Sequence, residues 1–144
     1  MYDIIVLNAS WDEDREELIQ LRTRVFVEEQ KVPAALEMDG RDAESAHVKA
    51  LIDDVIVGTG RLLPNGFIGR MCVFREHRNR GIATMMLKNL VQQAADNGHQ
   101  KVSLNSQSYV IPFYQKFGFT TDSEEFIEAG ILHRRMILNI HSEI

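Results

Sequence analysis

Apolar and polar positions alternate along the chain in a way that predicts short strands separated by amphipathic helices. Helical spacing of the apolar residues predicts helices over residues 10–32, 81–97 and 112–116. The apolar runs that predict strands span residues 2–7, 46–52, 55–63, 67–74, 101–105 and 130–140. The resulting order, β-α-β-β-β-α-β-α-β, predicts an α+β domain whose mixed central β-sheet is flanked by helices.

Local signals mark the ends of several elements. Ser10-Trp11-Asp12-Glu13 has the spacing of a capping box, so the first helix should begin there. Residues 33–45 open with a proline and are rich in acids, which predicts a loop or a broken helix. Asp53-Asp54 is a turn sequence between two strands and predicts a hairpin. The strand–helix–strand unit of residues 67–105 should be parallel with a right-handed crossover.

Length and composition predict one domain that spans residues 1–144. Hydrophobic residues make up 44% of the chain and charged residues 26%, as in ordinary globular proteins. The single cysteine, Cys72, cannot form an internal disulfide, which suits a reducing cytoplasm. The N-terminus lacks the pattern of a signal peptide, and no stretch approaches the ~20 apolar residues of a membrane helix. We therefore expect a cytoplasmic protein with no membrane partner, and a homodimer is left open.

The segment Arg78-Asn79-Arg80-Gly81-Ile82-Ala83 joins a predicted strand to the N-terminus of a predicted helix. Unpaired backbone N–H groups and the helix dipole make such a position suitable for phosphate. Gly81 has no Cβ to block close approach, and Arg78 and Arg80 can add charge-assisted hydrogen bonds. This chemistry predicts a pyrophosphate cradle, although an ordinary helix start with solvated arginines fits the hexapeptide equally well.

The glycine spacing of this turn differs from that of a P-loop and from that of a dinucleotide-binding fold. Its pattern, Arg78-x-x-Gly81-x-Ala83, resembles the acyl-CoA signature of the GNAT N-acetyltransferase superfamily, Arg/Gln-x-x-Gly-x-Gly/Ala. A second feature of that superfamily follows in residues 104–119. There a strand ends at Asn105 and a helix carries Phe-Tyr before it closes at Gly-Phe.

Three further segments resemble the ElaA-like branch of the superfamily. They are residues 25–33, residues 37–40 with the later His47, and Glu128-Ala129-Gly130-Ile131-Leu132-His133. That branch usually has proline where this chain has Leu132, so the resemblance does not fix the turn before His133. With the two features above, the resemblance covers nearly the whole chain.

The resemblance implies a GNAT fold that uses acetyl-CoA as the acyl donor and no metal. The strand of residues 69–73 would splay from its parallel neighbour and leave backbone groups free to pair with the pantetheine arm. Asn105 would hydrogen-bond that arm or a water beside it. The implied cofactor-binding residues are Met71, Cys72, Val73, Arg78, Asn79, Arg80, Gly81, Ile82, Ala83, Thr84, Asn105 and Tyr114.

Tyr114 matches the position that protonates the departing CoA thiolate in many GNAT enzymes. A phenol with a pKa of about 10 can donate to a thiolate whose pKa is roughly 8.5–10. The neighbouring Phe113 and Phe117 are expected to form core instead. Cys72 could accept an acyl group, but a lone cysteine in an apolar strand is more often a small buried hydrophobe.

The acceptor amine must lose a proton, and four residues are candidates for the general base: Glu28, Glu29, His47 and His133. A histidine has a suitable intrinsic pKa, and a carboxylate could also attract a cationic amine. We take Glu28 and His133 as catalytic candidates beside Tyr114. Solvated acids at a helix end and structural histidine hydrogen bonds are the alternatives for each.

The leading hypothesis is an acetyl-CoA-dependent N-acetyltransferase that works by direct attack in a ternary complex. Its acceptor would be a primary amine on a small molecule or a peptide. The alternative is a non-catalytic acyl-CoA-binding sensor or partner-docking module, which would need the cradle but no thiolate donor. A nucleic-acid partner is not expected, because the formal net charge is −5 and nucleic-acid-binding surfaces are normally basic.

Overall fold

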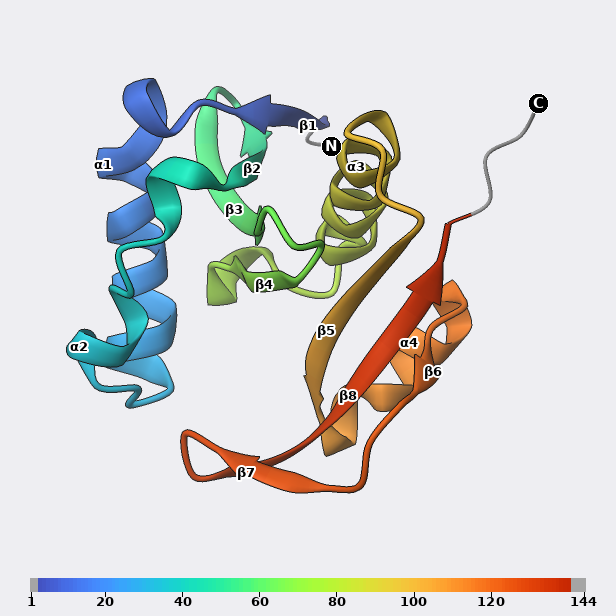
Figure 1. The fold of residues 1–144 in the computed structure, drawn as a ribbon. Helices are drawn as coiled ribbons and strands as arrows, with labels where there is room; N and C mark the ends of the chain where they lie inside the picture. The colour runs from blue at the N-terminus through green and yellow to red at the C-terminus, as the bar shows by residue number, and fades with distance from the viewer. Residues whose placement is uncertain (1–2, 141–144) are drawn as a thin grey trace.

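The computed structural model describes residues 3–140 and confirms the α+β architecture (Figure 1). Tyr2, where the first strand is expected to begin, lies outside the described residues. The strands are β1 (Ile4–Ala9), β2 (Ala46–Ile52), β3 (Val55–Leu62), β4 (Ile68–Val73), β5 (Lys101–Gln107), β6 (Thr120–Thr121), β7 (Phe126–Glu128) and β8 (Ile131–Asn139). The α-helices are α1 (Trp11–Arg22), α2 (Ala34–Glu37), α3 (Ile82–Asp96) and α4 (Ile111–Phe117). No helix among residues 3–140 is both long and apolar enough to cross a membrane.

The strands form two antiparallel sheets. The first has the order β1-β2-β3-β4, and in the second β8 pairs with β5, β6 and β7. The parallel pairing expected between β4 and β5 is confined to one bridge, Phe67 with Ser103, where the Ser103 N–H donates to the Gly66 carbonyl at 3.1 Å. The two strands then separate, as Figure 1 shows. Within residues 3–140 the sheet is therefore mixed only at this bridge, and the facing backbone groups of β4 and β5 beyond it do not pair with each other.

The first helix begins where the sequence predicts, but a different acid satisfies its N-terminus. The Ser10 side chain makes no capping hydrogen bond, and the Ser10 N–H donates to Asp14 Oδ2 at 2.9 Å, so Glu13 is not the capping partner. After α1 the chain widens into a π-helix, Thr23–Glu29, in which the Gln30 N–H donates to the Val25 carbonyl. Such wide turns often occur at functional sites. Residues 33–45 form the broken helix expected, with α2 followed by a 3-10 turn at Asp42–Glu44.

Two hydrophobic clusters lie on opposite faces of the first sheet. Ile56 of β3 belongs to the cluster under α1, and the next residue, Val57, belongs to the cluster under α3, as strand alternation requires. Figure 1 shows α1 and α3 on opposite sides of this sheet. The face of α3 predicted from helical spacing is fully buried: Ile82, Met86, Leu90 and Ala94.

Candidate active site

A cleft of about 860 Å³ opens where β4 and β5 separate. Its walls come from the π-helix, α2, β4, the turn before α3, the end of β5, α4 and the β7–β8 hairpin. Segments far apart in sequence therefore meet around one space. Most of the predicted site residues line this cleft, but Arg80 and Glu28 do not.

The β4 wall carries a β-bulge. Thr59 pairs with Cys72 and Arg61 pairs with Gly69, so two residues of β4 oppose the single Gly60 of β3. Arg70, in the bulge, has a φ of 52°. Bulges leave a residue unpaired and re-aim the backbone, which is why they occur beside active sites. Here the distorted backbone faces the cleft next to the predicted contact residues Met71, Cys72 and Val73.

The turn before α3 has the backbone of an anion cradle. Gly81 caps α3 with a φ of 79°, and Asn79 also has a positive φ, 65°. A Cβ added to Gly81 would meet nothing within 4 Å, so glycine is needed there for its backbone conformation rather than for space. The N–H groups of Ile82, Ala83 and Thr84 precede the first intrahelical bond, which Met85 makes to Gly81 at 3.2 Å. These residues line the cleft.

The two arginine side chains of the turn differ in their surroundings: Arg78 is paired with an acid, and Arg80 is exposed. Arg78 Nη1 and Nη2 donate to the two carboxylate oxygens of Glu29 at 2.6 and 2.8 Å, and Arg78 Nε donates to the Val73 carbonyl at 2.9 Å. The hydrogen bonds from Arg78 lower the pKa of Glu29, so Glu29 is unsuited to serve as a base. Arg80 is exposed and does not line the cleft. Arg78 thus ties the end of the π-helix to the cradle, and the cradle relies on backbone donors.

Tyr114 and Asn105 both line the cleft, from α4 and β5. The Tyr114 ring packs edge-on against Phe113 and Phe119, at centroid distances of 5.0 and 5.7 Å, and burial raises the pKa of its phenol to about 12. The phenol is therefore protonated at neutral pH and can donate a hydrogen bond. Phe113 and Phe117 pack against the core, as expected.

His133 faces the cleft from β8, opposite the end of β5. Its Nδ1 donates to the Ile131 carbonyl at 2.7 Å, because a carbonyl can only accept. In the neutral imidazole Nε2 then carries the lone pair, and this nitrogen lies 3.6 Å from Glu128 Oε2. Asn105 Nδ2 donates to the other Glu128 oxygen at 3.4 Å. Glu128 is a site residue that sequence reasoning missed, because only the hairpin register brings it beside His133.

Two other base candidates lie away from the cleft. Glu28 is exposed on the π-helix and does not line the cleft, so the structure does not bring it to Tyr114. His47 is buried between elements, stacked on Trp11 at 4.9 Å with its Nε2 at 2.9 Å from the Asp42 carbonyl. Burial lowers the pKa of His47. These contacts fit the alternative stated for this residue, a structural histidine hydrogen bond.

Cys72 lines the cleft but is not suited to nucleophilic attack. Its side chain is only 7% exposed and packs in the cluster under α1. Burial raises the pKa of the thiol to about 12, so the thiolate is scarce at neutral pH. The interpretation of Cys72 as a small buried hydrophobe is supported.

A buried ionic network, absent from the sequence prediction, fixes the acid-rich segment 33–45. Arg22, 1% exposed, donates from Nε to Glu37 Oε1 at 2.5 Å and from Nη1 to Asp42 Oδ1 at 2.6 Å. Arg61 forms two bonds with Asp39 at 2.8 and 2.9 Å and a third with Asp42 at 3.2 Å.

The network reaches the cleft through β4. Arg70 Nη2 donates to the carbonyls of Leu36 and Glu37 at 3.0 and 3.1 Å, and all three residues line the cleft. Because Arg70 lies in the bulge, the same contacts hold α2 against the distorted part of β4. The sequence carries one signal of this network, because Arg22 lies on the apolar face of α1 beside Leu18 and Leu21.

The residues of the cleft suit a long, anionic ligand with amide groups. The cradle offers unpaired N–H donors at one end, and the β4 bulge offers free backbone along its length. His77 Nδ1, in the wall beside the cradle, is buried and has no hydrogen-bond partner within residues 3–140. Such an orphaned polar atom is costly unless a ligand or water satisfies it. Among the same residues, no group of three His, Cys, Asp or Glu side chains could hold a metal ion.

Backbone N–H groups at a helix N-terminus and a buried tyrosine thus border one cleft between diverging strands. Residues 11–140 match the family model described as the acetyltransferase (GNAT) domain. The chain therefore belongs to the GNAT N-acetyltransferase family, whose members use acyl-CoA donors.

Individual relatives support the same assignment. The N-acetyltransferase YjcF of Bacillus subtilis is 38% identical over 133 residues, which cover 90% of this chain and 95% of YjcF. An acyl-CoA N-acyltransferase from Pseudomonas aeruginosa has a TM-score of 0.80 at 29% identity, covering 95% of this chain and 99% of that one. Escherichia coli ElaA has a TM-score of 0.81 at 27% identity, with the same coverage. The predicted resemblance to ElaA is confirmed.

Proposed function

We propose that this chain transfers the acetyl group of acetyl-CoA to a primary amine by direct attack in a ternary complex. One observation carries the proposal. The cradle of residues 79–84, Tyr114, Asn105 and the pair formed by His133 and Glu128 all line the same cleft. A binding module would need the first of these but not the others.

We extend the proposal to the setting of the protein. Residues 1–144 would act as one domain in the cytoplasm, where the buried thiol of Cys72 stays reduced. Every group that we invoke comes from one chain, so a homodimer is compatible with the site but not needed for it. The acceptor would be a small-molecule or peptide amine, with no nucleic acid or membrane involved.

Bound acetyl-CoA would supply a thioester, whose carbonyl carbon is attacked by the amine nitrogen while the C–S bond breaks and CoA leaves as a thiolate. The backbone N–H groups of Ile82, Ala83 and Thr84 would hold phosphate at the helix N-terminus. The β4 bulge would orient the reacting end through backbone hydrogen bonds. Most of the acceleration would come from this orientation.

Tyr114 would stabilise the departing sulfur. With a pKa of about 12, the phenol is a weaker acid than a thiol of roughly 8.5–10. We therefore assign it mainly as a hydrogen-bond donor to the developing thiolate rather than as a source of a fully transferred proton. A fixed donor in a dry pocket stabilises developing charge strongly.

His133 would accept the proton that the attacking amine loses. Its Nε2 lies 3.6 Å from Glu128 Oε2, and both residues line the cleft. The carboxylate would stabilise the imidazolium that results. The same two acceptors can bind the amine as an ammonium before it is deprotonated, since an ammonium has three N–H donors. Glu128 is thus a positioning partner for His133 and a counter-ion for the acceptor.

Calorimetry with acetyl-CoA, combined with free-thiol release over a panel of amines, tests the proposal. We expect micromolar-range binding and thiol release that depends on the amine. Gly81→Ala should weaken acetyl-CoA binding, because alanine strains the cradle at a φ of 79°. Gly98→Ala is a matched control, since Gly98 also has a positive φ of 86° and open space around it, at the far end of α3.

The outcomes separate the two candidate functions. Binding of acetyl-CoA without thiol release for any amine would support the sensor and contradict the transferase. Equal loss of affinity in the Gly81 and Gly98 variants would show that strain in α3, rather than the cradle, governs binding.

A further inference from the structure

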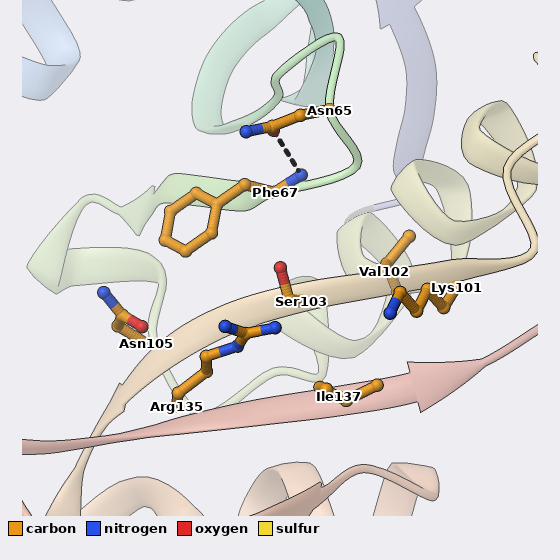
Figure 2. Close-up of a pocket in the computed structure, with 8 residues that line it drawn as sticks. All are labelled: Asn65, Phe67, Lys101, Val102, Ser103, Asn105, Arg135 and Ile137. Atoms are coloured by element: carbon orange, nitrogen blue, oxygen red, sulfur yellow. Dashed lines mark hydrogen bonds between the residues drawn. The ribbon is translucent and has the colours of Figure 1, made fainter. Parts of the chain in front are cut away.

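A second cavity, of about 400 Å³, adjoins the candidate active site on the face of β5 and β8 (Figure 2). It shares Phe67 and Asn105 with the larger cleft, so the two spaces meet at the end of the β4–β5 opening. Strand alternation decides which side chains reach it. Register places Ser103 and Asn105 of β5 beside Ile137 and Arg135 of β8 on one face.

That face is separate from the one that packs on the core. The intervening residues, Val102 and Leu104, are buried in the cluster to which Tyr114 of α4 also contributes. The thiolate donor therefore approaches from the α4 side of the second sheet. His133 lies on the opposite face of the second sheet from α4, which it shares with Arg135, two residues along β8. The acceptor should therefore lie on the face that carries His133 and Arg135.

The polar groups of the cavity are nearly all hydrogen-bond donors. Lys101 and Arg135 contribute cations, Ser103 contributes a hydroxyl, and no aspartate or glutamate lines the cavity within the described residues. Asn65 uses its carbonyl oxygen to accept from the Phe67 N–H at 3.1 Å, which leaves its amide NH₂ to donate. Two cations without a lining acid are unexpected in a chain with a net charge of −5.

Arg135 is the central group of this cavity. Its ion pair in the described part of the chain joins Nε to Asp122 Oδ2 at 3.5 Å, so the Nη groups have no protein partner there. Figure 2 shows the guanidinium on the cavity side of β8, close to Ser103 and Asn105. A guanidinium with free Nη donors is well suited to bind a carboxylate or phosphate.

We propose that this cavity binds an anionic group of the acceptor, so that the substrate is an amine that also carries a carboxylate or phosphate. This inference rests on the proposed transferase function. The amine would lie at His133 and Glu128, and the anion at Arg135, Ser103 and Lys101. Residues two apart on a strand are about 7 Å apart, so the anion should be several bonds from the amine rather than adjacent to it.

Paired probes that differ only in charge test the proposal. γ-Aminobutyrate should be acetylated with a kcat/KM about 10- to 100-fold above that of γ-aminobutyramide, which corresponds to one charge-assisted hydrogen-bonded contact. Glycine should be a poorer acceptor than γ-aminobutyrate because its carboxylate is too close to the amine. Phosphoethanolamine, compared with ethanolamine, shows whether phosphate is accepted in place of carboxylate.

Arg135→Gln should reduce the γ-aminobutyrate to γ-aminobutyramide ratio to about one. Arg134→Gln is the matched control, because Arg134 points to the opposite face of β8 and donates to the Ser123 carbonyl at 3.0 Å. The control should keep the ratio of the unmodified protein. An equal preference for the two probes, or a ratio that survives in Arg135→Gln, would overturn the inference and leave the transferase proposal standing.

A binding arm keeps the inference independent of turnover. In protein saturated with CoA, calorimetry should show tighter binding of γ-aminobutyrate than of γ-aminobutyramide, and Arg135→Gln should abolish the difference. If neither probe nor any other amine gave thiol release, the transferase function would be contradicted. The calorimetric ratio would still decide whether the cavity binds anions. Equal dissociation constants in the unmodified protein would overturn the inference.

Discussion

Replacing Glu37 with glutamine tests whether the buried ionic network holds the cleft wall in place. Glu37 is 1% exposed, and its Oε1 accepts from Arg22 Nε at 2.5 Å, so the substitution removes one of two negative partners of a buried cation. The other partner, Asp42 at 2.6 Å from Arg22 Nη1, remains. Shape is nearly conserved, so the change is mainly one of charge.

The expected magnitude follows from burial. Removing one partner of a buried ion pair typically costs 3–5 kcal/mol, because it leaves an uncompensated charge away from water. Asp42 still compensates Arg22 in part, so we expect the lower end, about 3 kcal/mol. That corresponds to roughly a hundredfold change in the folding equilibrium constant. The melting temperature should fall by about 6–12 °C for a domain of this size.

Urea unfolding followed by circular dichroism measures this loss. Glu44→Gln is the matched control, because Glu44 pairs with Arg41 at 2.9 Å while their side chains are 53% and 44% exposed. Exposed pairs of this kind contribute about 0–1 kcal/mol. If Glu37→Gln destabilised the protein no more than Glu44→Gln, the network would not be what fixes residues 33–45, and the argument from burial would be refuted.

Three further predictions concern chemistry and pH. Tyr114→Phe should lower kcat about 100-fold or more with little change in acetyl-CoA affinity, because it removes one donor to the thiolate while the ring packing remains. Unchanged turnover across the pH range would remove Tyr114 from the mechanism. Arg61 lowers the pKa of Asp39, and for Asp42 the hydrogen bonds and charges of Arg22 and Arg61 outweigh burial and also lower the pKa. Both carboxylates therefore stabilise the fold above the ordinary Asp pKa of about 3.9, and that contribution is lost as the pH falls below it. The urea midpoint should drop in this acid range, and a midpoint that stays level down to pH 3 would contradict the network. Burial raises the pKa of the Cys72 thiol to about 12, so this thiol should react with a thiol reagent only after unfolding. Cys72→Ala should keep turnover within a small factor. Rapid labelling of the native protein would show that the thiol is reactive.

The parts of the fold that sequence predicted well are those encoded by local pattern. The buried face of α3 follows directly from 3.6-residue spacing, and the cradle follows from a glycine between a strand and a helix. β6 and β7 were missed because strands of two and three residues are too short to show alternation. Their pairing with β8 supplies the stability that their own sequences lack.

The parts of the site that sequence could not predict depend on contacts between distant segments. Arg78 was expected at phosphate, but Glu29, 49 residues earlier, binds both of its terminal nitrogens. Glu128 became a site residue only because the hairpin register places it beside His133. Glu28 has the right chemistry for a base, but the π-helix leaves it exposed outside the cleft.

Following a labelled acetyl group tests the central claim, direct transfer in one cleft, most directly. Protein mixed with labelled acetyl-CoA is sampled with and without an acceptor amine, and the label is located by mass spectrometry. Direct transfer predicts that label passes from CoA to the amine nitrogen at the rate of thiol release and never accumulates on the protein. Label that appears on Cys72 or another side chain before the amine is added, or that never reaches any amine while acetyl-CoA binds, would contradict it.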